Sequence, residues 1–161
     1  HVPGEILTKG PNVLLGYYKN EEATRAAIDA DGWFHTGDLG TMDAQGNVFI
    51  KGRSKNMLLG SNGQNIYPEE LEDKLNSMPM VSESVVIQSG DKLIGLIHPD
   101  YDEAKTMGLN DGDLVNIMEQ NRQDFNAVMP PYARLSEVRI HEEEFEKTPK
   151  KSIKRYLYTA Q

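Results

Sequence analysis

The sequence predicts an α+β fold: a central antiparallel or mixed sheet of about three strands with flanking helices. Two apolar segments, residues 84–89 and 93–98, are joined by Gly90-Asp91-Lys92, a pattern typical of an antiparallel hairpin. Residues 136–141 alternate apolar with polar side chains and predict a third strand. The longest helix is expected over 110–129, and strands separated from helices in this way favour α+β.

The first third of the chain predicts short elements. Residues 5–9 have the composition of a strand, and Asn20 can cap a helix over 21–30. Asp43 to Asn47 form a hairpin turn that leads into a strand over 48–50. These elements are too few to close a core. We therefore expect residues 1–53 to be the β-rich end of a larger N-terminal domain, and residues 54–161 to be a separate C-terminal domain.

Two helices of the C-terminal part have clear start signals. Pro68 lies at a first turn, where its missing N–H costs nothing, and two glutamates follow it at the positive end of the helix dipole. Asn110 and Asp113 have the spacing of a capping box for the long helix. The expected buried stripes of the two helices are Leu71, Leu75 and Met78, and Leu114, Met118, Phe125 and Met129.

Composition excludes several classes of protein. The 161 residues carry a net charge of −8, which disfavours a nucleic-acid partner, and no apolar run is long enough for a membrane span. Cysteine is absent, so a disulfide framework and a thiol nucleophile are excluded, and a cytoplasmic location is expected. The chain begins with His1, which suggests a processed protein or an excised fragment, and no secretory leader is visible. The four histidines show no metal-ligand spacing, so no metal site is predicted.

Two short segments could bind a nucleotide. In Thr36-Gly37-Asp38 a carboxylate on a turn can accept hydrogen bonds from a ribose diol, although Gly-Asp is also common in surface turns. In Gly52-Arg53-Ser54-Lys55 the guanidinium offers a fork for phosphate or ribose oxygens, although a solvated charge pair after a strand has the same sequence.

A glycine-rich loop and a basic segment could also bind anionic groups. Gly60, Ser61, Asn62 and Gly63 precede a helix, so their N–H groups could line an anion, but a plain connector explains them equally well. Lys147 to Arg155 contains five cations, and a lysine there could neutralise charge on a phosphoryl oxygen. The alternative is a helix start with solvated charges, capped by Thr148 or Ser152.

Four segments in this order resemble a known family. GEILTKGPNVLLGYYKNEEAT, GWFHTGDLG, KGRSKNMLLGSNGQNIYPEELE and KTPKKSIKRYLY resemble the C-terminal end of the adenylate-forming acyl-CoA synthetases, in particular bacterial long-chain fatty-acid–CoA ligases. The resemblance implies a ligase that activates a fatty acid with Mg-ATP to an acyl-adenylate and transfers it to coenzyme A. It also implies that the phosphate loop, the Mg²⁺ ligands and the acyl pocket lie in an N-terminal domain outside this chain, so that the chain alone is inactive.

The resemblance assigns roles to individual residues. Asp38 matches the aspartate that holds the ribose hydroxyls of ATP and of the acyl-adenylate, and Arg53 matches an arginine that contacts the nucleotide. Lys55 lies at the hinge position of a mobile lid domain, and Gly60 to Gly63 match the segment that lies near coenzyme A during thioester formation.

The last motif departs from the family pattern. It usually reads Thr-Pro-x-Gly-Lys-Ile, with the lysine stabilising the adenylation transition state, but a gapless alignment places Ser152 at that lysine position. We expect Lys151 to supply the charge, with Lys150 and Lys154 as alternatives, since a serine carries none. The departure leaves open a non-catalytic member that binds nucleotide or acyl-adenylate and regulates another process. A third hypothesis, binding of nucleic acid or anionic lipid by Lys147 to Arg155, is opposed by the neighbouring glutamates.

Overall fold

The computed structural model describes residues 2–60 and 62–159. The chain divides into two units, residues 1–57 and 58–161, and each is described by itself. The assignment of residues 1–53 to the end of a larger domain, and of 54–161 to a mobile domain, stays a prediction.

The first unit is built around a three-stranded antiparallel sheet in the order β1-β2-β3. The Asn20 side chain caps the helix by accepting from the N–H of Ala23, as predicted, but the helix ends at Ala27 rather than Ala30. It ends early because Ile28 is extended and forms a bridge with Phe34. The elements are β1 (Gly4–Thr8), α1 (Glu21–Ala27), β2 (Phe34–Met42), β3 (Val48–Arg53) and the 3₁₀ helix η1 (Ser54–Asn56).

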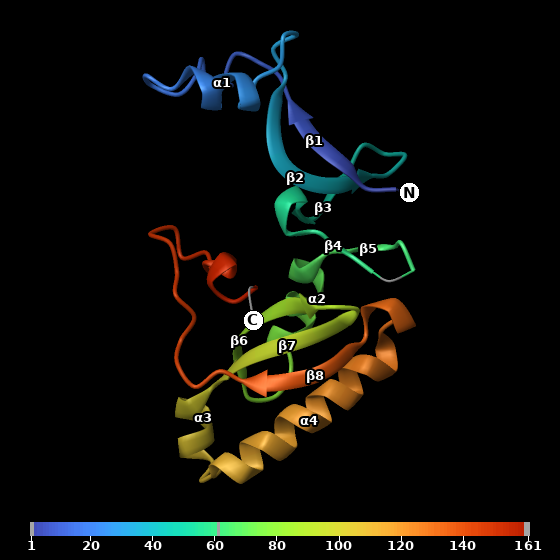
Figure 1. Ribbon diagram of the computed structural model, residues 1–161, viewed down its shortest axis with the longest axis vertical. Helices are drawn as coiled ribbons and strands as arrows, with labels where there is room; N and C mark the ends of the chain where they lie inside the picture. Colours follow the sequence, from blue (N-terminus) through green and yellow to red (C-terminus); the bar gives the residue numbers. More distant parts are fainter. Residues whose placement is uncertain (1, 61, 160–161) are drawn as a thin grey trace. The chain divides into compact units, whose positions relative to one another are not determined.

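The second unit confirms the predicted α+β class. Its central sheet is mixed: β6 and β7 form the predicted antiparallel hairpin, whereas β8 lies parallel to β7 because a helical connection returns the chain between them (Figure 1). A two-stranded hairpin, β4 (Leu58–Leu59) and β5 (Asn65–Ile66), precedes the first helix. The remaining elements are α2 (Pro68–Asn76), β6 (Val81–Ser89), β7 (Lys92–Pro99), α3 (Tyr101–Thr106), α4 (Asp111–Val128), η2 (Pro131–Ala133), β8 (Leu135–Ile140) and η3 (Arg155–Leu157).

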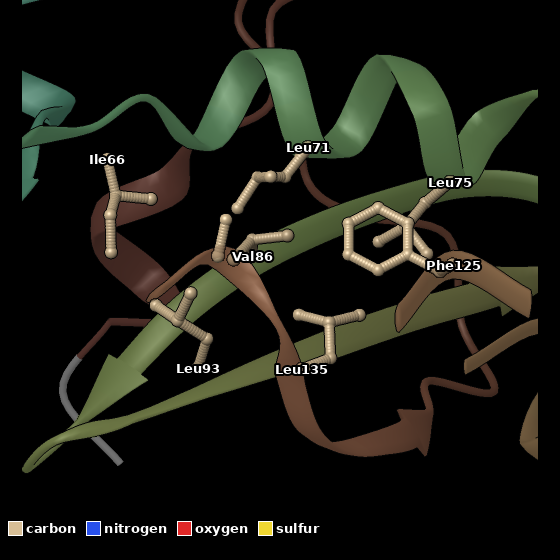
Figure 2. Close-up of a cluster of buried hydrophobic side chains, with 8 residues drawn as sticks. Ile66, Leu71, Leu75, Val86, Leu93, Phe125 and Leu135 are labelled. Carbon is tan, nitrogen blue, oxygen red and sulfur yellow. The ribbon is translucent and has the colours of Figure 1, made fainter. Parts of the chain in front are cut away.

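Helices α2 and α4 pack their apolar side chains on the same face of this sheet. Pro68 begins α2 and the capping box of Asn110 and Asp113 begins α4, both as the sequence predicts. Figure 2 shows side chains of α2 pointing toward Phe125 and toward the strands. The core there consists of Ile66, Leu71, Leu75, Val86, Leu93, Phe125, Ala133 and Leu135. Gly95 lies in the middle of β7 on this face, where an added Cβ would be 3.2 Å from Leu135 Cδ1, so a larger residue would require the Leu135 side chain to shift.

The opposite face of the sheet is covered by the C-terminal segment, residues 142–158, rather than by an α-helix. Phe145 is fully buried against it, and the ring of Tyr158 meets the ring of Phe145 edge-on at a centroid distance of 5.0 Å. The sheet side chains beneath them are Val85, Ile87, Ile94 and Leu96. The basic end of the chain is therefore held on the sheet by apolar contacts.

Candidate functional site

Asp38 and Arg53 lie opposite each other on β2 and β3 and form an ion pair. The distance from Asp38 Oδ1 to Arg53 Nη1 is 2.9 Å, and the two side chains are 33% and 48% exposed. The sequence predicted Asp38 on a turn. The structure places it inside strand β2, because the turn lies further on, at Asp43 to Asn47. Both charged groups are accessible to a ligand from solvent.

The backbone beside Asp38 has an unusual conformation. Gly37 has a φ of +71°, which is unfavourable for a residue with a Cβ. The Thr36 hydroxyl donates to the carbonyl of Ile6 at 2.7 Å and accepts from the Asp38 N–H at 3.1 Å. These bonds fix the backbone that carries the carboxylate.

A carboxylate on β1 holds the same segment and was not found from the sequence. Glu5 accepts from the Gly37 N–H at 3.1 Å, and its other oxygen lies 2.8 Å from His35 Nδ1. The hydrogen bond from His35 lowers the pKa of Glu5, and the same bond raises the pKa of His35. Asp29 also faces the ring, with Oδ2 at 3.5 Å from Nε2. Cross-strand partners of this kind cannot be read from local spacing.

Lys55 lies in the 3₁₀ turn η1 and its side chain is exposed. The division between the two units falls two residues later, after Met57. At the end of this short turn the Met57 N–H donates to the Ser54 carbonyl at 3.4 Å.

The glycine-rich loop is the turn of the β4–β5 hairpin. The Gly60 N–H donates to the Gln64 carbonyl and the Gly63 N–H donates to the Gly60 carbonyl, each at 2.8 Å. These two N–H groups are thus used within the turn, which argues against the predicted anion cradle. The Asn62 side chain accepts from the Gln64 N–H at 3.2 Å, and Ser61 lies outside the described residues.

A shallow pocket of about 190 Å³ lies beside this hairpin. Gly60 forms part of its wall, and Tyr132 and Arg134 from the segment before β8 face it. Arg134 and Tyr132 give the pocket one cation and one phenol that can contact an anionic ligand, and the carboxylate of Asp91 also lines it.

The basic segment forms a second hairpin, where the sequence suggested a helix start as an alternative. Lys147 and Ile153 form a bridge, and the Thr148 N–H donates to the Ser152 carbonyl at 2.8 Å. The turn closes with the Lys151 N–H donating to the Thr148 carbonyl at 2.8 Å, and Lys151 has a φ of +62°. Thr148 and Ser152 pair across this turn, so neither starts a helix.

Three of the five cations in this segment are held in ion pairs. Lys147 contacts Glu83 on β6 at 2.7 Å, Lys154 contacts Glu146, and Arg155 contacts Glu72 on α2 at 2.6 Å. The last two of the five, Lys150 and Lys151, have no ion-pair partner among residues 2–60 and 62–159. They lie at the hairpin tip and are exposed. The tip therefore presents two ammonium groups that are free to meet a ligand.

The predicted site residues fall into separate groups. The structure pairs Asp38 with Arg53, and it places Gly60, Asn62 and Gly63 in one hairpin turn. Lys151 lies on the other hairpin, near the end of the chain. Within the described ranges there is no cluster of three or more potential metal ligands, and no helix there is long and apolar enough to cross a bilayer.

Comparison with known proteins identifies the family. The sequence model of the AMP-binding enzyme C-terminal domain matches residues 55–161. The chain belongs to this family. The order of the four sequence segments had led to the same adenylate-forming enzymes.

Relatives of this AMP-binding enzyme C-terminal domain act on different acids. The chain is 40% identical over 123 residues to a 3-[(3aS,4S,7aS)-7a-methyl-1,5-dioxo-octahydro-1H-inden-4-yl]propanoyl:CoA ligase of Mycobacterium tuberculosis, covering 76% of the chain and 24% of the relative. It is 45% identical over 97 residues to the 2-succinylbenzoate–CoA ligase of Bacillus cytotoxicus, covering 60% and 20%. It is 41% identical over 120 residues to the long-chain-fatty-acid–CoA ligase FadD15 of M. tuberculosis, covering 69% and 20%. The chain thus spans about a quarter or less of these relatives.

Solved structures of the family carry nucleotide ligands. The chain is 25% identical to ATP-bound MatB from Rhodopseudomonas palustris, with a TM-score of 0.70 over 97% of the chain and 29% of that protein. It is 26% identical to the o-succinylbenzoate CoA synthetase MenE of Bacillus subtilis in complex with the acyl-adenylate intermediate OSB-AMP, with a TM-score of 0.71 over 100% and 31%.

Proposed function

We propose that the chain is the C-terminal part of an AMP-forming fatty-acid–CoA ligase. In the first half-reaction the fatty-acid carboxylate attacks the α-phosphate of ATP, forming the acyl-adenylate and releasing pyrophosphate. In the second, the thiol of coenzyme A attacks the acyl carbon and AMP leaves. A preceding N-terminal domain supplies the acyl pocket and the Mg²⁺ ligands, and Mg²⁺ bound there stabilises the phosphate charges. The chain alone is expected to be inactive.

The hairpin of residues 147–153, called the lysine hairpin below, is the observation that carries this proposal. Its turn has a left-handed residue at 151, the position of glycine in the family motif, which supports the gapless alignment that puts Ser152 at the lysine position. With Lys154 paired to Glu146, the ammonium groups that remain available are those of Lys150 and Lys151. We assign Lys151 as the group that neutralises charge on the α-phosphate during adenylation.

The other site residues fit a nucleotide and coenzyme A. Asp38 can accept hydrogen bonds from the two ribose hydroxyls while Arg53 orients its carboxylate, since the pair is solvent-accessible. Lys55, close to the division between the two units, serves as the hinge. The Gly60–Gly63 turn and the adjacent pocket with Arg134 lie near coenzyme A in the thioester-forming state.

ATP–pyrophosphate exchange by the complete protein tests the assignment of Lys151. Lys151→Ala is expected to lower the exchange rate by about 100-fold, the usual loss when one group that stabilises transition-state charge is removed. Lys105→Ala, an exposed lysine on α3, is the matched control and should retain full exchange. If only Lys150→Ala lowers the exchange rate, the role belongs to Lys150. Full exchange in both Lys150→Ala and Lys151→Ala refutes a catalytic role of the hairpin lysines.

A proline at the hinge tests Lys55. Lys55→Pro fixes φ near −65° and should impair thioester formation more than adenylation, because only the second half-reaction requires the rotated state. The two rates are measured separately, as pyrophosphate exchange and as coenzyme A transfer from supplied acyl-adenylate. Equal losses in both would remove the hinge assignment.

The fatty-acid specificity is tested by substrate comparison, because the relatives are named as ligases of an octahydroindenyl-propanoyl group, of 2-succinylbenzoate and of long-chain fatty acids. The complete protein is expected to prefer a long-chain fatty acid, such as palmitate, over 2-succinylbenzoate by at least tenfold in kcat/KM. A preference for the aromatic acid would leave the ligase assignment intact and replace the substrate.

Ser152 supports a second candidate, a non-catalytic member that binds nucleotide or acyl-adenylate and regulates another process. A hydroxyl at the lysine position supplies no charge. In this case the wild-type protein binds acyl-adenylate without turnover, and Ser152→Lys raises adenylation by orders of magnitude. No gain from Ser152→Lys, together with activity of the wild type, excludes this candidate.

A further inference from the structure

The Arg155 side chain is held by hydrogen bonds to two residues, Glu72 and Val86. Its guanidinium donates to both oxygens of Glu72, Nη1 to Oε1 and Nη2 to Oε2, each at 2.6 Å. Nη1 also donates to the Val86 carbonyl at 3.2 Å, and the Val86 N–H donates to Glu72 Oε1 at 2.7 Å. The side chains of Arg155 and Glu72 are only 17% and 11% exposed. Two parallel hydrogen bonds fix the orientation of a guanidinium as well as its position.

This ion pair lies at the base of the lysine hairpin. Arg155 follows the strand-like residues Ile153 and Lys154, which return the chain from the tip. On the other side of the stem, Lys147 is held by Glu83 on β6 at 2.7 Å. One ion pair thus connects each side of the hairpin to the rest of the domain: Lys147 to β6 and Arg155 to α2.

The two anchors differ in strength. The Lys147–Glu83 pair is more exposed, with side chains 28% and 25% accessible, and lysine makes a single contact through a flexible stem. The Arg155–Glu72 pair is more deeply buried, bidentate and linked to the β6 backbone. Burial raises the pKa of Glu72, while the guanidinium of Arg155 opposes that shift. The Arg155–Glu72 pair is therefore the anchor that sets the hairpin direction.

We propose that Glu72 and Arg155 are positioning residues for adenylation, because their ion pair orients the hairpin that presents Lys151. This inference rests on the proposed function, since the benefit of orientation is realised only when the ammonium group meets the α-phosphate. A displacement of about 1 Å at a reacting group can lower a rate by about 100-fold. The tip itself, with a left-handed Lys151, is joined to its stem by backbone hydrogen bonds between Lys151 and Thr148 and between Thr148 and Ser152.

The experiment uses the complete protein with Arg155→Met, Arg155→Lys and Glu72→Gln. Arg139→Met is the matched control, because Arg139 forms a bidentate pair with Glu137 on its own strand that is about half exposed and includes no hairpin residue. A charge reversal of the pair is less informative, since it would place an arginine against the Val86 N–H and a carboxylate against the Val86 carbonyl.

Adenylation and thioester formation are measured separately. Arg155→Met should lower kcat of ATP–pyrophosphate exchange by about 100-fold with KM for ATP within about twofold, and Arg155→Lys should recover about tenfold of that loss. Transfer to coenzyme A from supplied acyl-adenylate should stay within about twofold. Equal losses in both half-reactions, in step with a fall in thermal stability, would show a merely structural role and overturn the inference.

Trypsin cleavage gives a readout that does not depend on activity. Cleavage after Lys150 and Lys151 should be at least tenfold faster in Arg155→Lys and Glu72→Gln than in the wild type, and unchanged in Arg139→Met. Unchanged hairpin cleavage in both pair variants refutes the anchoring even if one of them is inactive. Absence of adenylation by the wild-type protein would refute the proposed function, whereas the cleavage rates would still decide whether the pair anchors the hairpin.

Discussion

The two units of the chain differ in how they bury apolar side chains. Every buried hydrophobic residue in the described part of the chain lies at Ile66 or beyond, in the second unit. The first unit instead exposes Val48, Phe49 and Ile50 at 53%, 53% and 71% on the edge strand β3. Exposed apolar strands of this kind mark a surface that another part of a protein covers. From this difference in burial we expect residues 58–161 to fold by themselves and residues 1–57 to fold only together with further chain.

The largest expected effect comes from separating the units. A polypeptide of residues 58–161 should unfold cooperatively with heat, because it contains the sheet and both sides of its core. A polypeptide of residues 1–57 should show no cooperative transition by circular dichroism. A sharp transition in the polypeptide of residues 1–57 would contradict the expectation that this unit does not fold alone.

Truncation of one phenylalanine in each unit tests the difference in apolar burial between the two units. Phe125→Ala should lower the free energy of unfolding by about 3–5 kcal/mol, because this ring is completely buried in the core. Phe49→Ala should change it by less than about 1 kcal/mol, since this ring is half exposed. Chemical denaturation of the 161-residue chain measures both values, and similar losses at the two positions would contradict the difference in burial.

A smaller effect is expected from glycine at the left-handed residue of the lysine hairpin. Lys151→Gly should stabilise the second unit by about 0.5–1 kcal/mol, because a φ of +62° is unfavourable for a residue with a Cβ. Lys150→Gly, at a residue without positive φ, should destabilise it slightly. Denaturation midpoints compare the two, and a loss of stability in Lys151→Gly would show that the lysine stem contributes packing.

The smallest expected effect is a pH dependence of the stability of the first unit. The hydrogen bond to Glu5 raises the pKa of His35 above 6.5, so its stabilising contribution is complete below pH 6.5 and is lost as the pH rises through the raised pKa. Titration of the His35 ring by NMR should show this shift, and Glu5→Gln should reduce it. Glu22→Gln, on the exposed face of α1, is the control and should leave the titration unchanged. An unchanged titration in Glu5→Gln would assign the shift to Asp29.

The sequence predicted the elements that local chemistry determines. The capping box at Asn110, the proline at the start of α2 and the β6–β7 hairpin all depend on residues within a few positions of one another. The short helix α3 was not predicted, although Asp100 caps it, because six residues give no clear periodicity. The sequence does not distinguish an antiparallel from a mixed sheet, since the direction of β8 depends on where the connection returns the chain.

The candidate site was less accessible to sequence reasoning. The residues of Asp38 and Arg53 were found, but not their pairing across two strands. In the sequence Arg155 resembles the four other cations of its segment, because its partner Glu72 lies 83 residues away. Glu5 was missed for the same reason, since it reaches His35 and Gly37 only once β1 pairs with β2. Interactions between distant residues decide which charges are available, and local motifs do not contain them.

The segment that covers the second face of the sheet has a consequence for synthesis of the protein. Phe145, Ile153 and Tyr158 complete a core whose strands were translated some fifty residues earlier. On the ribosome the β6–β7 hairpin therefore emerges with one apolar face uncovered, and that face stays open until the last of these aromatic residues leaves the exit tunnel. A nascent chain stalled before Tyr158 should accordingly be the form of this domain most prone to chaperone binding and aggregation.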